Sequence, residues 1–146
     1  MDKDVARRAF EMALASYKPD FETFFLARLF GLDFSYGENT CRVEFPVHAF
    51  MDNPQGSLHG GVIAFVLDVS MGHLIKHVLG TPGVTLEMKV QYLATVRPPR
   101  ASCEARFLRQ GRSIAFLEAH LRDAHGNLAA AATSTRSRRT STCSRP

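Results

Sequence analysis

Residues 58–79 constrain the fold of this chain more than any other segment. Their apolar side chains follow a helical spacing and leave almost no polar face before His73. A helix that is apolar nearly all the way round must be covered on most sides by other parts of the protein. The segment therefore predicts a long central helix that is buried in the fold.

The residues after this helix change to the alternation of apolar and polar side chains that is typical of β-strands. Turn residues divide them into four predicted strands, over residues 84–94, 101–110, 113–123 and 128–135. The same alternation predicts a hairpin before the helix, over residues 32–47 with its turn at 37–39. This order has no βαβ alternation, so it predicts an α+β fold in which a curved antiparallel sheet of about six strands wraps around the helix.

Both ends of the chain depart from this pattern. Residues 4–17 and 21–30 have the spacing of two short helices. Residues 133–146 contain no large apolar side chain and are predicted to be disordered. The predicted division is a domain over residues 1–135, whose first 30 residues hold the N-terminal helices, and a basic tail over residues 136–146.

The positive charge of the chain is confined to that tail. The formal net charge is +4, and four of the 18 Lys and Arg residues lie in the tail, so the domain itself is neutral. A charge excess outside the domain gives no basic face for DNA or RNA, and we expect no nucleic-acid partner. The longest apolar run, residues 60–67, is far shorter than the about 20 residues of a membrane span, so we expect no membrane partner.

The cysteines and the N-terminus indicate a cytoplasmic protein. The three cysteines are odd in number and widely spaced, which argues against a disulfide framework. The first residues contain no cationic start followed by an apolar run, so we expect no secretion signal. His73 and His77 have a spacing that suits zinc, but no third ligand lies nearby, and we expect no metal.

The junction between the loop and the central helix carries the candidate chemistry. Gly60 and Gly61 leave the backbone bare there, so a ligand can approach it closely. The first amides of a helix lack intrahelical acceptors and carry the positive end of its dipole, which makes them a candidate oxyanion hole. Asp68 is a carboxylate in an otherwise apolar helix, where burial without a role is costly. The glycines could instead permit close packing, and Asp68 could cap a neighbouring turn.

The spacing between His59 and Asp68 bears on how the two could act together. Nine residues of helix make about 2.5 turns and roughly 13 Å, so the two side chains point to opposite sides. They are too far apart to contact one carbonyl group within a single chain. If both act on the same substrate, a second copy must supply one of them, which predicts a site across a two-fold dimer.

Three blocks of the sequence resemble the PaaI-type acyl-CoA thioesterases of the hot-dog fold superfamily. The first contains Asn53, Gly56, residues 58–61 and Asp68. The other two are residues 83–93, and residues 110–116 followed by the turn at 126–127. The resemblance extends over residues 20–135 and implies the hot-dog fold, in which a sheet wraps around a long helix.

The resemblance also implies an activity, the hydrolysis of an acyl-CoA thioester to a free acid and coenzyme A. The Gly60 amide would polarise the thioester carbonyl, and Asp68 of the neighbouring subunit would act as general base or nucleophile. Thr85 would position the water, and His59 and Asn53 would shape the pocket. An aryl-acetyl or medium-chain acyl group is implied as substrate, without a metal or a separate cofactor.

Further contacts and the assembly follow from the same resemblance. Gly61 and Gln55 would contact the substrate. The family forms homodimers that commonly pair into homotetramers. Coenzyme A phosphates usually lie on basic groups near the surface, for which the candidates here are Arg97, Arg100, Arg109 and Arg112.

Several of these residues have a simpler interpretation. His59 could only hold the loop through a backbone hydrogen bond, and Asn53 before Pro54 is an ordinary turn pair. The Phe-rich segment over residues 21–30 could form core or dimer packing, or line an acyl pocket. The alternative function is a non-catalytic acyl-CoA-binding or regulatory hot-dog protein; the motif of hot-dog hydratases is not found here.

Overall fold

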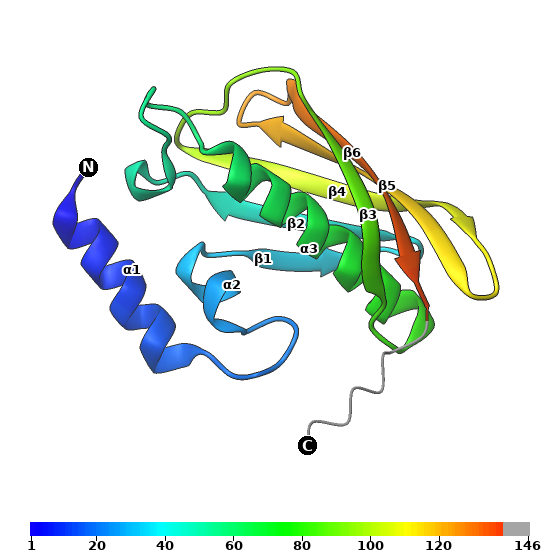
Figure 1. Ribbon diagram of the computed structural model, residues 1–146. Coiled ribbons are helices and arrows are strands. Elements are labelled where there is room, and N and C mark those ends of the chain that lie inside the picture. Colours follow the sequence, from blue (N-terminus) through cyan, green and yellow to red (C-terminus); the bar gives the residue numbers. More distant parts are fainter. Residues whose placement is uncertain (139–146) are drawn as a thin grey trace.

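A long helix, α3 (Gly60–Leu79), lies across one face of a six-stranded antiparallel sheet in the computed structural model of the protein, which describes residues 1–138 (Figure 1). The strands are β1 (Asp33–Tyr36), β2 (Thr40–Pro46), β3 (Val84–Tyr92), β4 (Arg100–Gln110), β5 (Ile114–Asp123) and β6 (Leu128–Ser137). Their order in the sheet is β1-β2-β4-β5-β6-β3. This arrangement confirms the predicted α+β fold, in which the sheet curves around the central helix.

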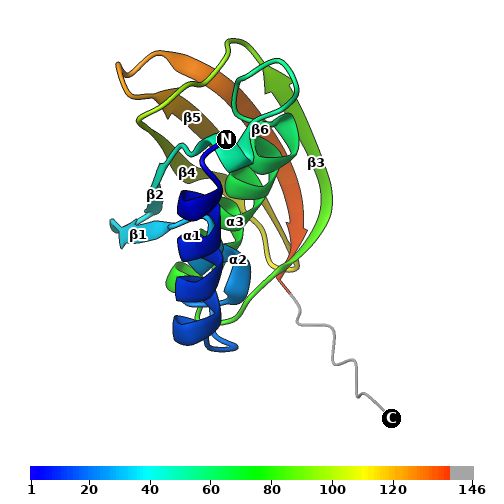
Figure 2. The same cartoon turned by 90° about the vertical axis from the view of Figure 1, so that its left-hand side faces the viewer.

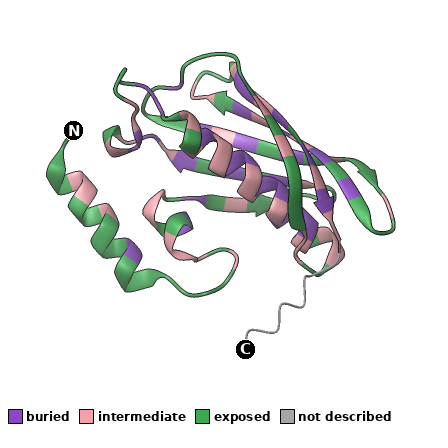
Figure 3. Cartoon of the chain, in the orientation of Figure 1, coloured by how far each residue is buried: buried purple, intermediate pink, exposed green. Residues whose placement is uncertain are grey.

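The core forms where α3 meets the concave face of the sheet. The side chains of Leu67, Met71 and Leu74 are fully buried on the helix. The facing positions of β4, β5 and β6 are mostly small, such as Ala105 and Ala119, so the helix backbone can approach the sheet closely. Burial alternates along β4 and β5 (Figure 3), and their buried residues form one core cluster with the buried residues of α3.

The packing of α3 accounts for its apolar sequence. By length and composition alone the helix could cross a membrane, with a mean hydropathy of 1.6. A helix at the centre of a fold needs the same composition, because apolar neighbours surround it on most sides.

The N-terminal helices lie beside this core rather than in it. Helix α1 (Lys3–Ser16) lies beside α2 (Phe25–Leu29) (Figure 2). The rings of Phe10 and Phe25 meet edge to face between them, with centroids 5.6 Å apart. The prediction of one helix over residues 21–30 is wrong for its first part. The Asp20 carboxylate accepts hydrogen bonds from the Thr23 amide and hydroxyl, which closes a turn in place of a helical start.

Strand β6 corrects the predicted boundary of the domain. It runs to Ser137 between β3 and β5, so residues 133–137 are ordered strand and not tail. The sheet holds these small and polar residues through backbone pairing on both sides, which does not need large apolar side chains. Ser134 and Arg136 point inward and are buried. The rest of the predicted tail, residues 139–146, lies outside the described residues.

Candidate active site

The loop before α3 is fixed by the side chain of Asn53. Its Oδ1 accepts hydrogen bonds from the Gln55 amide at 2.9 Å and the Ser57 amide at 3.3 Å. Gly56 in this loop has a φ of 75°, a conformation that favours glycine. Arg97 donates to the Gly56 carbonyl from outside the loop at 3.2 Å. These bonds hold the chain in one path up to the start of α3.

The start of α3 leaves one amide hydrogen without an acceptor. The Nδ1 atom of His59 accepts a hydrogen bond from the Gly61 amide at 2.8 Å, which gives His59 the role of N-cap. The His59 carbonyl accepts from the next two amides, those of Val62 and Ile63. No group in residues 1–138 accepts the Gly60 N–H. Gly60 is therefore the amide that the helix start offers to a ligand.

A cavity of about 380 Å³ opens beside this amide. Three of the predicted site residues, Asn53, Gln55 and Gly60, line this cavity. Tyr92 at the end of β3 forms another wall, and its hydroxyl donates to the Gly60 carbonyl at 2.9 Å. A Cβ atom on residue 60 would lie 3.3 Å from the Tyr92 ring, so a side chain there would require the ring to shift by a few tenths of an ångström. We call this the oxyanion cavity.

Asp68 lies farther along α3 and is held by two side chains from the sheet. The Thr85 hydroxyl donates to Asp68 Oδ1 at 2.9 Å. Nη2 of Arg136 donates to the same Oδ1 at 2.6 Å and to the Asp68 carbonyl oxygen at 2.7 Å. Although Asp68 belongs to an otherwise apolar helix, its side chain is 41% exposed and has Arg136 as an ion-pair partner.

A second cavity, of about 460 Å³, lies next to this carboxylate. Phe21 and Phe24 form an apolar wall of this cavity. Its polar lining residues are Asp20, Asp68, His73, Thr85 and Arg136. We call it the carboxylate cavity. The Phe-rich segment is thus divided: its first two rings face this cavity, while Phe25 and Phe30 pack on α1 and α3.

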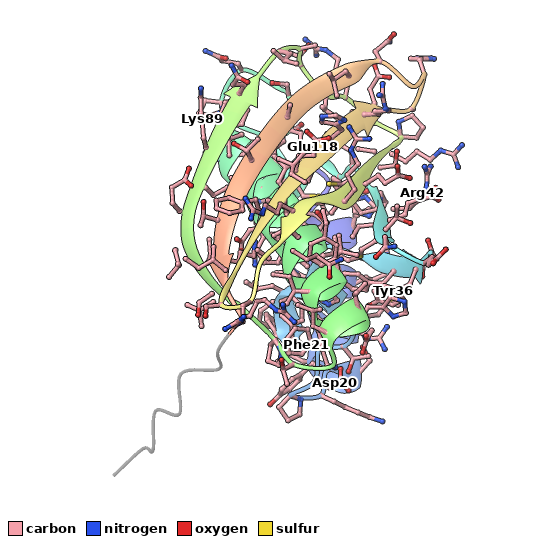
Figure 4. The ribbon with its side chains drawn as sticks, turned by 90° about the vertical axis from the view of Figure 1, so that its right-hand side faces the viewer. Asp20, Phe21, Tyr36, Arg42, Lys89 and Glu118 are labelled. Atoms are coloured by element: carbon pink, nitrogen blue, oxygen red, sulfur yellow. The ribbon has the colours of Figure 1, made fainter. Side chains whose placement is uncertain are left out.

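His73 ties the apolar wall to α3. Its ring stacks on Phe34 at 4.1 Å, Nδ1 lies 2.8 Å from the Val69 carbonyl oxygen, and Nε2 faces the Phe21 carbonyl. Burial lowers the pKa of this imidazole, because the charged form loses its hydration. Figure 4 shows Phe21 beside the last turns of α3. His77, the other member of the pair with zinc spacing, stacks on Tyr36 instead.

One chain does not bring Gly60 and Asp68 together. They are eight residues apart on α3, about 12 Å along the axis, and they line different cavities. The predicted arginines are also separated. Arg97 lies beside the oxyanion cavity, whereas Arg109 and Arg112 lie at the far end of β4. Strand β4 has 11 residues, a length of roughly 37 Å.

Arg136 and Tyr92, which bind Asp68 and Gly60 in these cavities, are not among the predicted site residues. The sequence places Arg136 in the predicted tail, and Tyr92 in the second block that resembles the family, without a role for either in the site. The signal for Arg136 is the period of two that continues from Ala132 through Ser134. A search for alternating apolar side chains misses this period, because its last two buried positions hold the polar residues Ser134 and Arg136.

Comparison with known proteins agrees with this architecture. Residues 55–130 match the model of the family described as the thioesterase superfamily. A protein of Saccharolobus solfataricus that is named provisionally as an esterase is 31% identical over 91 residues. That match covers 62% of this chain and 65% of the relative, a little under two thirds of the relative's length.

Solved structures share the same fold. A conserved protein of Pseudomonas aeruginosa is 32% identical, with a TM-score of 0.71 over 77% of this chain and 91% of that chain. Zebrafish thioesterase superfamily member 2 is 26% identical, with a TM-score of 0.73 over 92% and 96% of the two chains. A Bacillus halodurans protein solved with CoA is 24% identical, with a TM-score of 0.81 over 92% and 91%.

The hot-dog fold is thereby confirmed, while the PaaI type within it stays a prediction. The family match begins in the loop at Gln55 and includes the whole of α3, strands β3, β4 and β5, and the start of β6. Since the family model covers more than half of the sequence, the chain belongs to the thioesterase superfamily.

Proposed function

We propose that the protein is an acyl-CoA thioesterase whose active site joins Gly60 of one copy to Asp68 of a second copy. The observation that carries the proposal is that one chain holds two separate half-sites. The Gly60 N–H in the oxyanion cavity has no acceptor within residues 1–138, and Asp68 lies in another cavity about 12 Å farther along α3.

The oxyanion half is suited to stabilise charge on a carbonyl oxygen. The Gly60 N–H lies at the positive end of the α3 dipole, and the Asn53 loop and the His59 cap fix its direction. Attack on a thioester carbonyl moves negative charge onto its oxygen. A donor that is already in place stabilises this charge without further reorganisation.

The carboxylate half is suited to deliver the attacking oxygen. Asp68 Oδ1 accepts from Thr85 and Arg136, and no donor in residues 1–138 contacts Oδ2. Oδ2 can accept a proton from water as the water oxygen attacks the carbonyl carbon, or it can attack the carbon itself. In both routes the C–S bond breaks, coenzyme A leaves as the thiol, and water supplies the oxygen of the free acid.

Strand β3 supports a two-fold dimer that would join the halves. It lies at the edge of the sheet, and several of its apolar side chains are exposed, among them Leu86. An unpaired edge of this kind is a template for another strand. Antiparallel pairing of two β3 strands about Met88 and Lys89 would place Thr85 of one copy opposite Tyr92 of the other. Thr85 contacts Asp68, and Tyr92 contacts Gly60, so each half-site would meet its complement.

The carboxylate cavity supports an apolar acyl group. Its volume of about 460 Å³ falls in the range of small-molecule sites, and Phe21 and Phe24 provide apolar surface close to Asp68. An aryl-acetyl or medium-chain acyl group fits this chemistry. Arg97 is the first candidate to bind coenzyme A phosphates, because it lies beside the oxyanion cavity. The proposal also includes a tetramer, which rests on the family resemblance, and a cytoplasmic location, which rests on the sequence.

Release of free thiol from a panel of acyl-CoA thioesters tests the proposal. The panel contains aryl-acetyl, medium-chain and long-chain thioesters, and the same mixtures without protein give the background. We expect the wild-type protein to hydrolyse an aryl-acetyl or medium-chain thioester faster than a long-chain one. No turnover together with tight acyl-CoA binding in calorimetry would instead support the non-catalytic binder. If the protein neither hydrolyses nor binds any of these thioesters, the family membership gives its fold and not its function.

A further inference from the structure

We propose that Arg136 is a positioning residue that orients the carboxylate of Asp68 for the reaction. This inference rests on the proposed function. A single nitrogen, Nη2, binds two atoms of Asp68: Oδ1 at 2.6 Å and the carbonyl oxygen at 2.7 Å. Because one group belongs to the side chain and the other to the backbone, the contact fixes the rotation of the carboxylate relative to α3.

The contact also decides which carboxylate oxygen is free to react. Thr85 donates to the same Oδ1 as Arg136, so both donors act on one oxygen. No donor within the described residues contacts Oδ2. Arg136 and Thr85 therefore direct Oδ2 toward the substrate and hold Oδ1 away from it.

The burial of Arg136 argues against a purely structural role. Its side chain is only 3% exposed, and its buried Nε finds no hydrogen-bond partner within the described residues. A buried guanidinium that is partly unsatisfied is costly for folding. Asp68 does not need it for solvation, because the Asp68 side chain is 41% exposed. An apolar residue would fill the site at a lower cost, so the arginine is better explained by its effect on Asp68.

The surrounding structure makes room for this side chain. A Cβ atom on Gly72, one turn after Asp68, would lie 3.1 Å from Nη1 of Arg136. Gly72 and Arg136 line the carboxylate cavity together with Thr85. The guanidinium therefore reaches Asp68 from the sheet, past a position on α3 that carries no side chain.

Two substitutions separate positioning from packing. Arg136→Met removes the charge and keeps a long apolar chain, and Arg136→Lys keeps the charge with a shorter reach. We expect Arg136→Met to fold with an equal or higher Tm and to lower kcat about 10- to 100-fold, because a carboxylate that is free to rotate is misplaced for attack. KM is expected to change less than kcat, and Arg136→Lys to have an intermediate kcat. Arg138→Met is the matched control, because Arg138 contacts the Gly111 carbonyl and not Asp68.

A double-mutant cycle with Asp68→Asn completes the test. If Arg136 acts through Asp68, Arg136→Met has no further effect on kcat in the Asp68→Asn background. An equal loss of kcat in both backgrounds, a wild-type kcat in Arg136→Met, or loss of its fold would each overturn the inference. A wild-type protein that hydrolyses no thioester would overturn the proposed function and this inference together. The two failures are therefore distinguished by the activity of the wild type.

Discussion

Replacing Asp68 by asparagine is expected to lower kcat for thioester hydrolysis by about 10²- to 10⁴-fold, the range found for loss of a general base. Asparagine keeps the size of the side chain and can still accept the Thr85 hydrogen bond. It cannot take up a proton from water or form the acyl intermediate. KM should change little, because the carboxylate acts mainly in the transition state.

The control for this variant is Asp33→Asn, which removes a charge from an exposed carboxylate on β1. Its kcat is expected to equal that of the wild type. Steady-state thiol release measures both variants, and thermal unfolding shows that both are folded. An Asp68→Asn protein that kept kcat within a few-fold of wild type would remove Asp68 from the reaction.

A pair of substitutions at Gly60 is expected to isolate the effect of a single backbone amide. Gly60→Pro deletes the N–H, and proline is favoured at the first position of a helix. The preceding residue, His59, already has the extended conformation that proline requires of its neighbour, with a ψ of 134°. Gly60→Ala keeps the N–H and places a Cβ atom at the same 3.3 Å from the Tyr92 ring.

The comparison of these two variants gives the contribution of the oxyanion donor. We expect Gly60→Pro to have a kcat about 10²- to 10³-fold below that of Gly60→Ala, as for other losses of one oxyanion-hole donor. Both carry the new contact with Tyr92, so that contact cancels in the comparison. Equal kcat values in the two folded proteins would show that the Gly60 N–H does not bind the developing oxyanion.

The helices and strands could be predicted because their apolar side chains recur at regular helical or alternating positions. Helix α3 and the strands were located within a few residues from helical spacing and from alternation. The start of the second helix and the end of β6 were predicted wrongly, because apolar periodicity does not mark either boundary. A turn closed by Asp20 shortens the second helix, and the inward Ser134 and Arg136 hide the end of β6.

The candidate site was predictable where it is local in the sequence. Gly60 and the Asn53 loop are close neighbours along the chain, and the structure places them in one cavity. The ion pair between Asp68 and Arg136 joins residues that are 68 positions apart, and only the register of β6 beside β3 brings Arg136 to the helix. A single sequence holds no local signal for such a contact. The spacing between His59 and Asp68 nevertheless predicts a second copy if both ends of this segment act on one substrate.

Complementation between two inactive variants tests the shared site most directly. Asp68→Asn and Gly60→Pro, with different affinity tags, are co-expressed, and the mixed dimer is purified through both tags. In the mixed dimer one site contains Gly60 and Asp68 intact, and the other site carries both defects. We expect about half of the wild-type kcat per dimer, far above either variant alone. A purified mixed dimer as inactive as its parents would contradict an active site built from two copies of the chain.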